Sequence, residues 1–409
     1  MSTSNLVERP PFDALPLPVL QRIHLNFAME RVRWQAMRHM RRFAPRLIEA
    51  SGTYSDLCVG PHEFRTLIGS AVGPQPDAWL NDHDVPKLER IEHTLTSLER
   101  DLQTFEQSLE EEQLAALPIE HIRRAFHLDE DDIQLLMVVA APAINPAMMR
   151  LMTVTWADFA VRLPTAHYAA NMVSANPEHV VELIERLSDR SPLIKMRLLI
   201  PEPHAHYPRH TPRSHAPLSM DQRLIDTLSA APITQNIPAP YTYHDDGPPL
   251  NALFIPEGFA QTLTAALTSQ LPRLLLTGSR HSGRRTLVRA ISREALKQPT
   301  LEIDLHQLLT GSEPTSLPVR IAELQREARL LRATLLLRAE DELTASLPPA
   351  VLAQARRLGT LFADFPGAVV ATSPKRSQLL TELLASPVEM SYPSFSHREQ
   401  VTIWLSALQ

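Results

Sequence analysis

The sequence predicts an α/β domain with a parallel sheet in its C-terminal part, preceded by a mostly α-helical N-terminal region. Two observations on the 409-residue chain lead to this prediction. None of the 11 glycines lies between Gly73 and Gly247, and this glycine-free stretch favours helices joined by short proline-containing turns. From Leu271 onward, short apolar runs alternate with helical periodicity, as in a parallel sheet with crossover helices.

Composition and charge exclude several classes of protein. Hydrophobic residues make up 44% of the chain, which is enough for a sizeable core. The net charge of −6 argues against a protein that coats nucleic acid, so nucleic acid is not an expected partner. The single cysteine excludes an internal disulfide, and no apolar run approaches the ~20 residues of a membrane helix. We therefore expect a cytoplasmic protein without membrane insertion.

Two helices are expected near the N-terminus. The first, from Val19 to Phe43, is amphipathic with a basic polar face, which suits a solvated or partner-facing surface and leaves contact with DNA as an alternative. The second runs from about Val85 to Leu117 and carries apolar residues at alternating spacings of three and four: Leu88, Ile91, Leu95, Leu98, Leu102, Phe105 and Leu109. Such a heptad seam predicts either an antiparallel hairpin with a neighbouring helix or dimerisation.

The remaining helical part carries a capping signal and two candidate metal ligands. Asp129 to Asp132 precede an apolar run, and we interpret them as the cap of a helix. Helices continue from Asn145 to Ala231 with proline breaks at 146, 164, 177 and 192. His204 and His206 could chelate a metal, but they lie in a proline-rich loop without carboxylate or cysteine partners, so no metal site is predicted there.

The C-terminal part contains a glycine loop between a strand and a helix. The apolar run Leu274–Leu276 leads into Gly278-Ser279-Arg280-His281-Ser282-Gly283-Arg284-Arg285-Thr286, and a helical segment follows. The glycine spacing matches the phosphate-binding pattern of glycine, four residues, glycine, lysine, and serine or threonine. Backbone amides of such a turn converge at a helix N-terminus and attract phosphate, so we expect all nine residues to bind a nucleotide.

Further strands are expected after this loop. They cover Leu301 to Leu305, Thr334 to Leu337 and Ala368 to Ala371. The second of these ends at Arg338 and Ala339, where a nucleotide hydrolase of this build carries a metal-binding aspartate and a water-orienting glutamate. The acids Glu340, Asp341 and Glu342 follow two to four places late. The third strand leads into Ser373, which can still donate a hydrogen bond.

These features together resemble one module of the AAA+ ATPase family. The resemblance rests on the Leu274–Thr286 loop and on the strand ends Leu335–Glu342 and Val369–Ser373. Residues Asp129 to Ala230 resemble the helical, winged-helix-like region that precedes the module in some bacterial tandem AAA+ proteins. Composition, periodicity and this resemblance together predict five parts: a helical segment (1–80), a winged-helix-like domain with the heptad helix (81–236), a proline-rich linker (237–256), a nucleotide-binding domain (257–390) and the incomplete start of a helical lid (391–409).

Departures from the family pattern change the expected activity. Arg284 replaces the lysine, in keeping with a chain in which only four of 40 basic residues are lysine, and Arg285 offers no hydroxyl to magnesium. At the strand end, Arg338 and Ala339 replace the metal-binding and water-orienting acids, so no catalytic residue is expected to be intact apart from Ser373 at the sensor position. The resemblance allows ATP or ADP as the bound nucleotide, and binding with magnesium and binding without it are both compatible with these residues.

Three functions remain. The preferred one is a hydrolysis-deficient module that acts as a scaffold or regulatory part of a ring-forming ATPase, built from copies of this chain or with a partner AAA+ subunit. Some proteins of this build remodel protein clients or are encoded with contractile injection systems, but the client is not identified by the sequence. The second is an active ATPase with displaced metal ligands. The third is a winged-helix adaptor that binds nucleic acid or protein.

Overall fold

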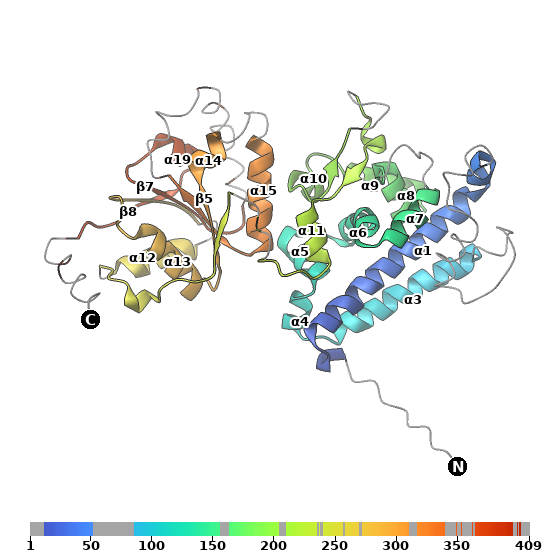
Figure 1. Cartoon of the computed structure of the whole chain (residues 1–409), viewed down its shortest axis with the longest axis horizontal. Coiled ribbons are helices and arrows are strands. Elements are labelled where there is room, and N and C mark those ends of the chain that lie inside the picture. Colours follow the sequence, from blue (N-terminus) through green and yellow to red (C-terminus); the bar gives the residue numbers. More distant parts are fainter. Residues whose placement is uncertain are drawn as a thin grey trace, which may run out of the picture. The chain divides into compact units, whose positions relative to one another are not determined.

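The computed structural model describes residues 12–51, 86–155, 163–203, 210–234, 240–256, 258–269, 272–310, 317–339 and 365–395, together with single residues at 237, 349, 353, 362, 399 and 401. The chain divides into two compact units, Met1–Pro232 and Ile233–Gln409. Figure 1 shows that helices make up most of the first unit, whereas a sheet forms the centre of the second.

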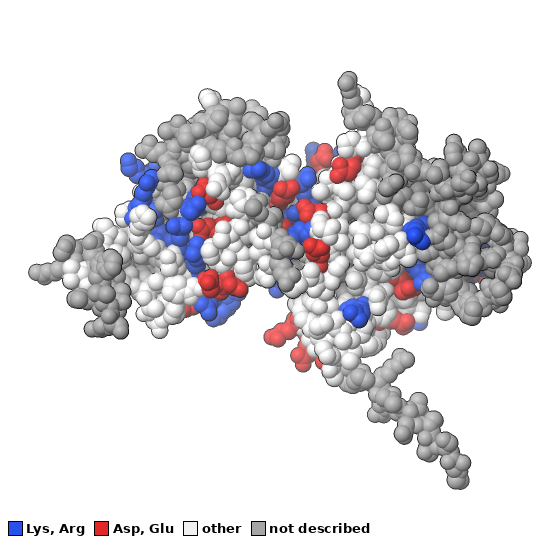
Figure 2. All heavy atoms as spheres, viewed as in Figure 1, with Lys and Arg blue, Asp and Glu red and all other residues white. Residues whose placement is uncertain are grey.

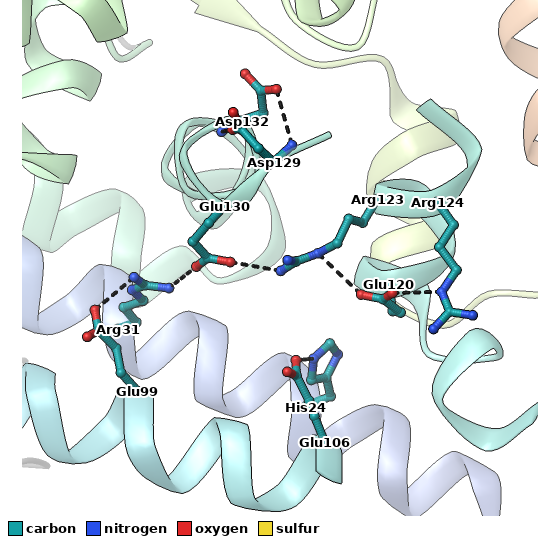
Figure 3. Close-up of polar contacts among 10 residues, drawn as sticks. All are labelled: His24, Arg31, Glu99, Glu106, Glu120, Arg123, Arg124, Asp129, Glu130 and Asp132. Carbon is teal, nitrogen blue, oxygen red and sulfur yellow. Dashed lines mark hydrogen bonds and ion pairs between the residues drawn. The ribbon is translucent and has the colours of Figure 1, made fainter. Parts of the chain in front are cut away.

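Unit 1 begins with a long antiparallel helix pair, α1 (Leu17–Ser51) and α3 (Leu88–Gln107). Ile91, Leu95 and Phe105 of the predicted heptad seam are buried. Ion pairs join the two helices in steps of seven residues, from His24–Glu106 through Arg31–Glu99 to Arg38–Glu92. The residue numbers rise along α1 as they fall along α3, so the seam closes within one chain as an antiparallel pair (Figures 1 and 3).

Shorter helices follow this pair, and prolines begin several of them. They are α4 (Glu111–Ala115), α5 (Pro118–Phe126), α6 (Glu130–Ile144), α7 (Pro146–Thr155), α8 (Ala166–Val173), α9 (Pro177–Glu185), α10 (Pro192–Lys195) and α11 (Gln222–Leu228). Proline lacks the N–H that an interior helix position must donate, and its fixed φ suits a first turn. The predicted cap at Asp129 is confirmed, because its side chain accepts from the Asp132 amide while the Asp132 side chain accepts from the Asp129 amide.

Charged side chains tie these helices together on the side shown in Figure 3. The guanidinium of Arg31 lies between Glu99 of α3 and Glu130 of α6, and Arg123 of α5 lies between Glu130 and Glu120. Arg124 extends the chain of contacts to Glu111 of α4. Because each of these three arginines contacts two carboxylates, the ion pairs link five helices, α1, α3, α4, α5 and α6.

In unit 2, the described residues form a six-stranded sheet in the order β3-β5-β6-β7-β4-β8. The strands are β3 (Thr242–His244), β4 (Arg273–Thr277), β5 (Thr300–Asp304), β6 (Thr334–Arg338), β7 (Val369–Ser373) and β8 (Val388–Ser391). Five of them run parallel, and only β3 pairs antiparallel, with β5. The α/β fold with a mostly parallel sheet therefore agrees with the sequence prediction.

Helices cover both faces of this sheet. Leu275 and Leu337 pack on one face with α14 (Leu305–Thr310), α15 (Leu317–Leu330) and α19 (Gln378–Leu383). Leu274 and Leu276 pack on the other face with α12 (Phe259–Leu267) and α13 (Arg284–Glu294) (Figure 1). Since successive side chains of a strand point to opposite faces, a fully apolar run such as 274–276 requires helices on both faces of the sheet.

Two strands were not anticipated from the sequence. β3 lies inside 237–256, the segment taken as a linker, and supplies one edge of the sheet by pairing with β5. β8 pairs with β4 on the other side, just before Tyr392 and Pro393. Both are short edge strands, and they lack the long apolar run of a central strand because the helices bury them less completely.

Candidate functional site

The glycine loop connects β4 to α13 at the carboxyl edge of the sheet. Gly283 is the residue before α13 and has a φ of +86°, a conformation that a side chain disfavours. Gly278 is needed for another reason, because a Cβ there would lie 2.9 Å from the Cβ of Tyr392. The first amides of α13 have no carbonyl acceptor within the helix, so they are available to an anion.

Two hollows adjoin this loop. One, of about 360 Å³, is lined by residues 280–286. The other, of about 470 Å³, lies between the loop and apolar side chains that include Leu253, Phe254, Tyr392 and Phe395. Phe395 forms edge-to-face contacts with both Phe254 and Tyr392, at ring-centroid distances of 5.4 and 6.1 Å. Each hollow falls in the size range of small-molecule sites, and the second offers flat apolar surface beside the first.

Arg284, at the position of the expected lysine, points beneath the loop. Its side chain is buried, and its Nη1 donates to the carbonyl oxygens of Gly278 and Ser373. The Gly278 amide also donates to the Ser373 carbonyl, at 3.2 Å. Arg284 therefore fastens the loop to the end of β7, and the backbone of Ser373 takes part in that contact.

Arg285, at the position of the expected magnesium-binding hydroxyl, contacts Glu302 of β5. Its Nη1 lies 3.0 Å from Glu302 Oε1, and Arg289 binds the other carboxylate oxygen. Burial would raise the pKa of the Glu302 carboxyl, but its hydrogen bonds and ion pairs with the two arginines outweigh burial and hold that pKa below its usual value. Glu302 is thus a charged partner that neutralises positive charge beside the loop.

At the ends of β5 and β6, next to the loop, the described side chains present no free carboxylate to a magnesium ion. Arg338, at the end of β6, pairs with Asp304 at the end of β5, with 2.5 Å between Nη2 and Oδ2. The other oxygen of Asp304 accepts the amides of His306 and Gln307 at the start of α14. Ala339 is buried and apolar. Glu340, Asp341 and Glu342 lie outside the described residues.

These contacts decide how well each expected group fits. The loop amides and the hollow beside residues 280–286 suit phosphate oxygens. A magnesium ion fits poorly, because the described side chains at its expected position are Arg285, Arg338 and Ala339. No cluster of three or more potential metal-ligating His, Cys, Asp or Glu side chains occurs in the described part of the chain, and His204 and His206 fall outside it.

Sequence reasoning missed the partners of the loop arginines and the aromatic hollow. Glu302 carried a signal, since a glutamate between Leu301 and Ile303 in a buried strand needs a cationic partner. For Phe254 and Tyr392 the sequence contains no such signal, because residues so far apart in the chain come together only after folding. In the first unit, the winged-helix-like character was expected, but the two helices of its helix-turn-helix were not singled out.

Unit 1 contains a helix-turn-helix followed by a small hairpin. α8 and α9 are joined by Ser174, Ala175 and Asn176, and the Asn176 side chain caps α9 by accepting from the Glu178 amide. β1 (Ile200–Pro201) and β2 (Leu218–Ser219) then pair antiparallel. Two arginines of α1 hold the end of α8: Arg38 donates to the Met172 and Val173 carbonyls, and Arg42 donates to the Ala175 carbonyl.

This arrangement of helix-turn-helix and hairpin defines a winged-helix type of domain. A family model described as "Winged helix domain, variant" matches residues 20–231, which is more than half of the chain. The chain belongs to this family, and the match begins within α1, so the long helix pair is part of the domain. A comparison with curated proteins found no match.

One finding bears on membranes. None of the described helices is, by itself, both long and apolar enough to cross a bilayer; only α6 and α7 pass such a test when joined, across a bend of 113°.

Proposed function

We propose that unit 2 binds ATP or ADP without appreciable hydrolysis and that the chain serves as a scaffold or regulatory part of a ring-forming ATPase. The observation that carries the proposal is the loop at residues 278–286, which borders a hollow for phosphates while the described strand ends beside it leave no carboxylate free for a metal. The apolar hollow with Phe254 and Tyr392 is suited to a flat base next to those phosphates.

Energetic magnitudes favour binding over turnover. Loss of a single group that stabilises charge in a transition state typically costs about 2.7–4 kcal/mol, or a factor of ~10²–10³ in rate. Here the magnesium-binding hydroxyl, the metal-binding acid and the water-orienting acid are replaced by Arg285, Arg338 and Ala339. Binding does not need these groups, because the helix amides can hold phosphate oxygens directly, and Arg280 is exposed on the same loop.

A titration of the full chain with a fluorescent ATP analogue, in magnesium or in EDTA, tests the proposal. We expect saturable binding of similar affinity in both buffers and phosphate release at the rate of the buffer alone. Gly283→Asp should abolish binding, because it places a carboxylate where the phosphates would lie. Gly258→Asp is the matched control: Gly258 also precedes a helix, has a φ of +78° and has open space around it.

Each alternative outcome has a clear meaning. Magnesium-dependent turnover that disappears in Gly283→Asp would establish the active-ATPase alternative and overturn the proposal. Equal loss of binding in Gly283→Asp and Gly258→Asp would show that the substitutions disturb folding rather than the loop. Absence of binding by the wild-type chain would refute the nucleotide site.

A winged-helix adaptor is the second candidate function, and the family match of unit 1 favours it. It does not compete with nucleotide binding, since it concerns the other unit.

A further inference from the structure

The second helix of the helix-turn-helix presents an unusual face to solvent. In DNA-binding proteins of this type, that helix enters the major groove. After Pro177 at its start, the exposed side chains of α9 are Glu178, Val181, Glu182 and Glu185. They lie on one side of the helix because they are adjacent or spaced three to four residues apart. Val181 is 58% exposed, the largest exposed fraction of any large hydrophobic side chain in the described chain.

The three glutamates on this face have no ion-pair partner among the described residues. This contrasts with the carboxylates of α5 and α6, such as Glu120 and Glu130, which are paired with arginines (Figure 3). Helix α9 itself contains no lysine or arginine. Its negative charge is therefore left to solvent or to another molecule.

The basic residues in and just after α9, His179 and Arg186, are already engaged on the side of α6. His179 Nε2 lies 3.0 Å from Asp131, and Arg186, just after α9, contacts Asp129, Asp131 and Asp132. These contacts keep cationic groups away from the exposed face of α9. Figure 2 shows that the acidic and basic side chains of the described residues are mixed on the face drawn there.

We propose that this α9 face, formed by Glu178, Val181, Glu182 and Glu185, docks a basic protein segment with arginines around one apolar residue. DNA phosphates would be repelled by three glutamates, whereas guanidinium groups would gain carboxylate partners. The exposed Val181 among the carboxylates matches an interface with an apolar centre and a polar rim. The inference concerns unit 1 alone and does not depend on nucleotide binding in unit 2.

The test measures binding of the full chain to a fluorescein-labelled helical peptide with arginines three and four residues apart around one leucine. The triple variant Glu178→Gln, Glu182→Gln, Glu185→Gln removes the charges and keeps the side-chain shape. We expect it to weaken binding by tenfold or more, on the order found for charge pairs at interfaces. Val181→Ser should weaken binding by roughly threefold to tenfold, because it removes an apolar contact.

The control variant removes the same number of charges elsewhere in unit 1: Glu89→Gln, Asp101→Asn and Glu112→Gln, all of exposed residues. It should bind the peptide within about twofold of wild type if the α9 face is the docking site, since only long-range charge is lost. Circular dichroism confirms that each variant is folded.

Three results would overturn the proposal. The first is no measurable peptide binding by the wild-type chain at moderate salt. The second is an equal loss in the α9 and control variants, which would show attraction by net charge alone. The third is saturable binding of duplex DNA that is altered by Val181→Ser but unaffected by the control substitutions, which would assign the face to nucleic acid.

Discussion

Several arginines of this chain act as buried carbonyl binders rather than surface charges. Arg273 of β4 donates to the carbonyls of Phe362 and Gly367, and Arg284 donates to those of Gly278 and Ser373. Arg38 of α1 does the same for two carbonyls of α8. A planar guanidinium can reach two acceptors at fixed angles, which an ammonium group does less well. The arginine-rich composition therefore has a structural use at these positions.

Arg284→Lys is expected to lower the free energy of unfolding of unit 2 by about 1 kcal/mol, because a lysine keeps one of the two carbonyl contacts and leaves the other unmade. Urea denaturation followed by circular dichroism measures the effect. Arg280→Lys is the control, since Arg280 is exposed on the same loop and should change stability by less than about 0.5 kcal/mol. A stability equal to wild type for Arg284→Lys would show that the carbonyl contacts contribute nothing.

His39 gives unit 1 a pH-dependent stability. Burial lowers the pKa of its imidazole to about 4, with smaller contributions from His167, Arg38 and Arg42. The neutral ring is preferred in the folded state, so stability is full above the unfolded pKa of about 6.5 and falls as the pH drops from there toward 4. The loss should approach ~3 kcal/mol at pH 4.

His39→Phe should remove this part of the pH dependence while keeping the edge-to-face contact with Tyr168. Urea unfolding of unit 1 at pH 7 and pH 4.5 provides the measurement. A variant that loses as much stability between these two pH values as wild type would place the acid sensitivity on other groups.

At the scale of elements, the α1–α3 pair resolves a choice that the heptad seam left open. The seam allowed a hairpin or a dimer, and the structure pairs it within the chain. The ion pairs at seven-residue intervals explain the direction, because a parallel arrangement would not bring His24 to Glu106 and Arg38 to Glu92 together. We expect the buried apolar stripe to contribute more stability than these partly exposed ion pairs, which select the orientation.

Phe105→Ala tests the stripe. Phe105 is fully buried and contacts the rings of Phe12, His24 and Phe27, so its truncation should cost about 3–5 kcal/mol. Leu88→Ala, in the same seam but 38% exposed, should cost less than about 1 kcal/mol. Chemical denaturation of both variants gives the comparison, and similar losses would mean that the seam is not packed as described.

For the whole molecule, sequence patterns predicted what depends on local residues. The apolar runs located β4, β5, β6 and β7, the glycine loop was placed between strand and helix, and Asp129 was recognised as a cap. Partners from distant parts of the chain were not predictable. Nothing local to Arg338 indicates its pairing with Asp304, and nothing local to Phe254 indicates that it shares a hollow with Tyr392, since strand register and packing bring such residues together. The short edge strands β3 and β8 were not predicted for a related reason: they form only by pairing with the neighbouring strands β5 and β4.

The division into two units predicts where a nucleotide acts. At a concentration of 100 times its dissociation constant, ATP should stabilise the unit that binds it by about 2.7 kcal/mol. Hydrogen exchange of the full chain should then slow in the described strands of unit 2, above all β4 and β7, and stay unchanged in α1 and α3. Slower exchange in unit 1 alone would contradict a site at the glycine loop, and Gly283→Asp should abolish the effect in unit 2.

The hydrogen bonds from Arg38 and Arg42 to the end of α8 and the turn before α9 have a mechanical consequence. Both side chains belong to α1, the longest helix of unit 1, and they hold the carbonyls of Met172, Val173 and Ala175. A force on α9 would therefore be transmitted directly to α1 through these hydrogen bonds. Any displacement of α1 would in turn reach the start of α9 through these three hydrogen bonds.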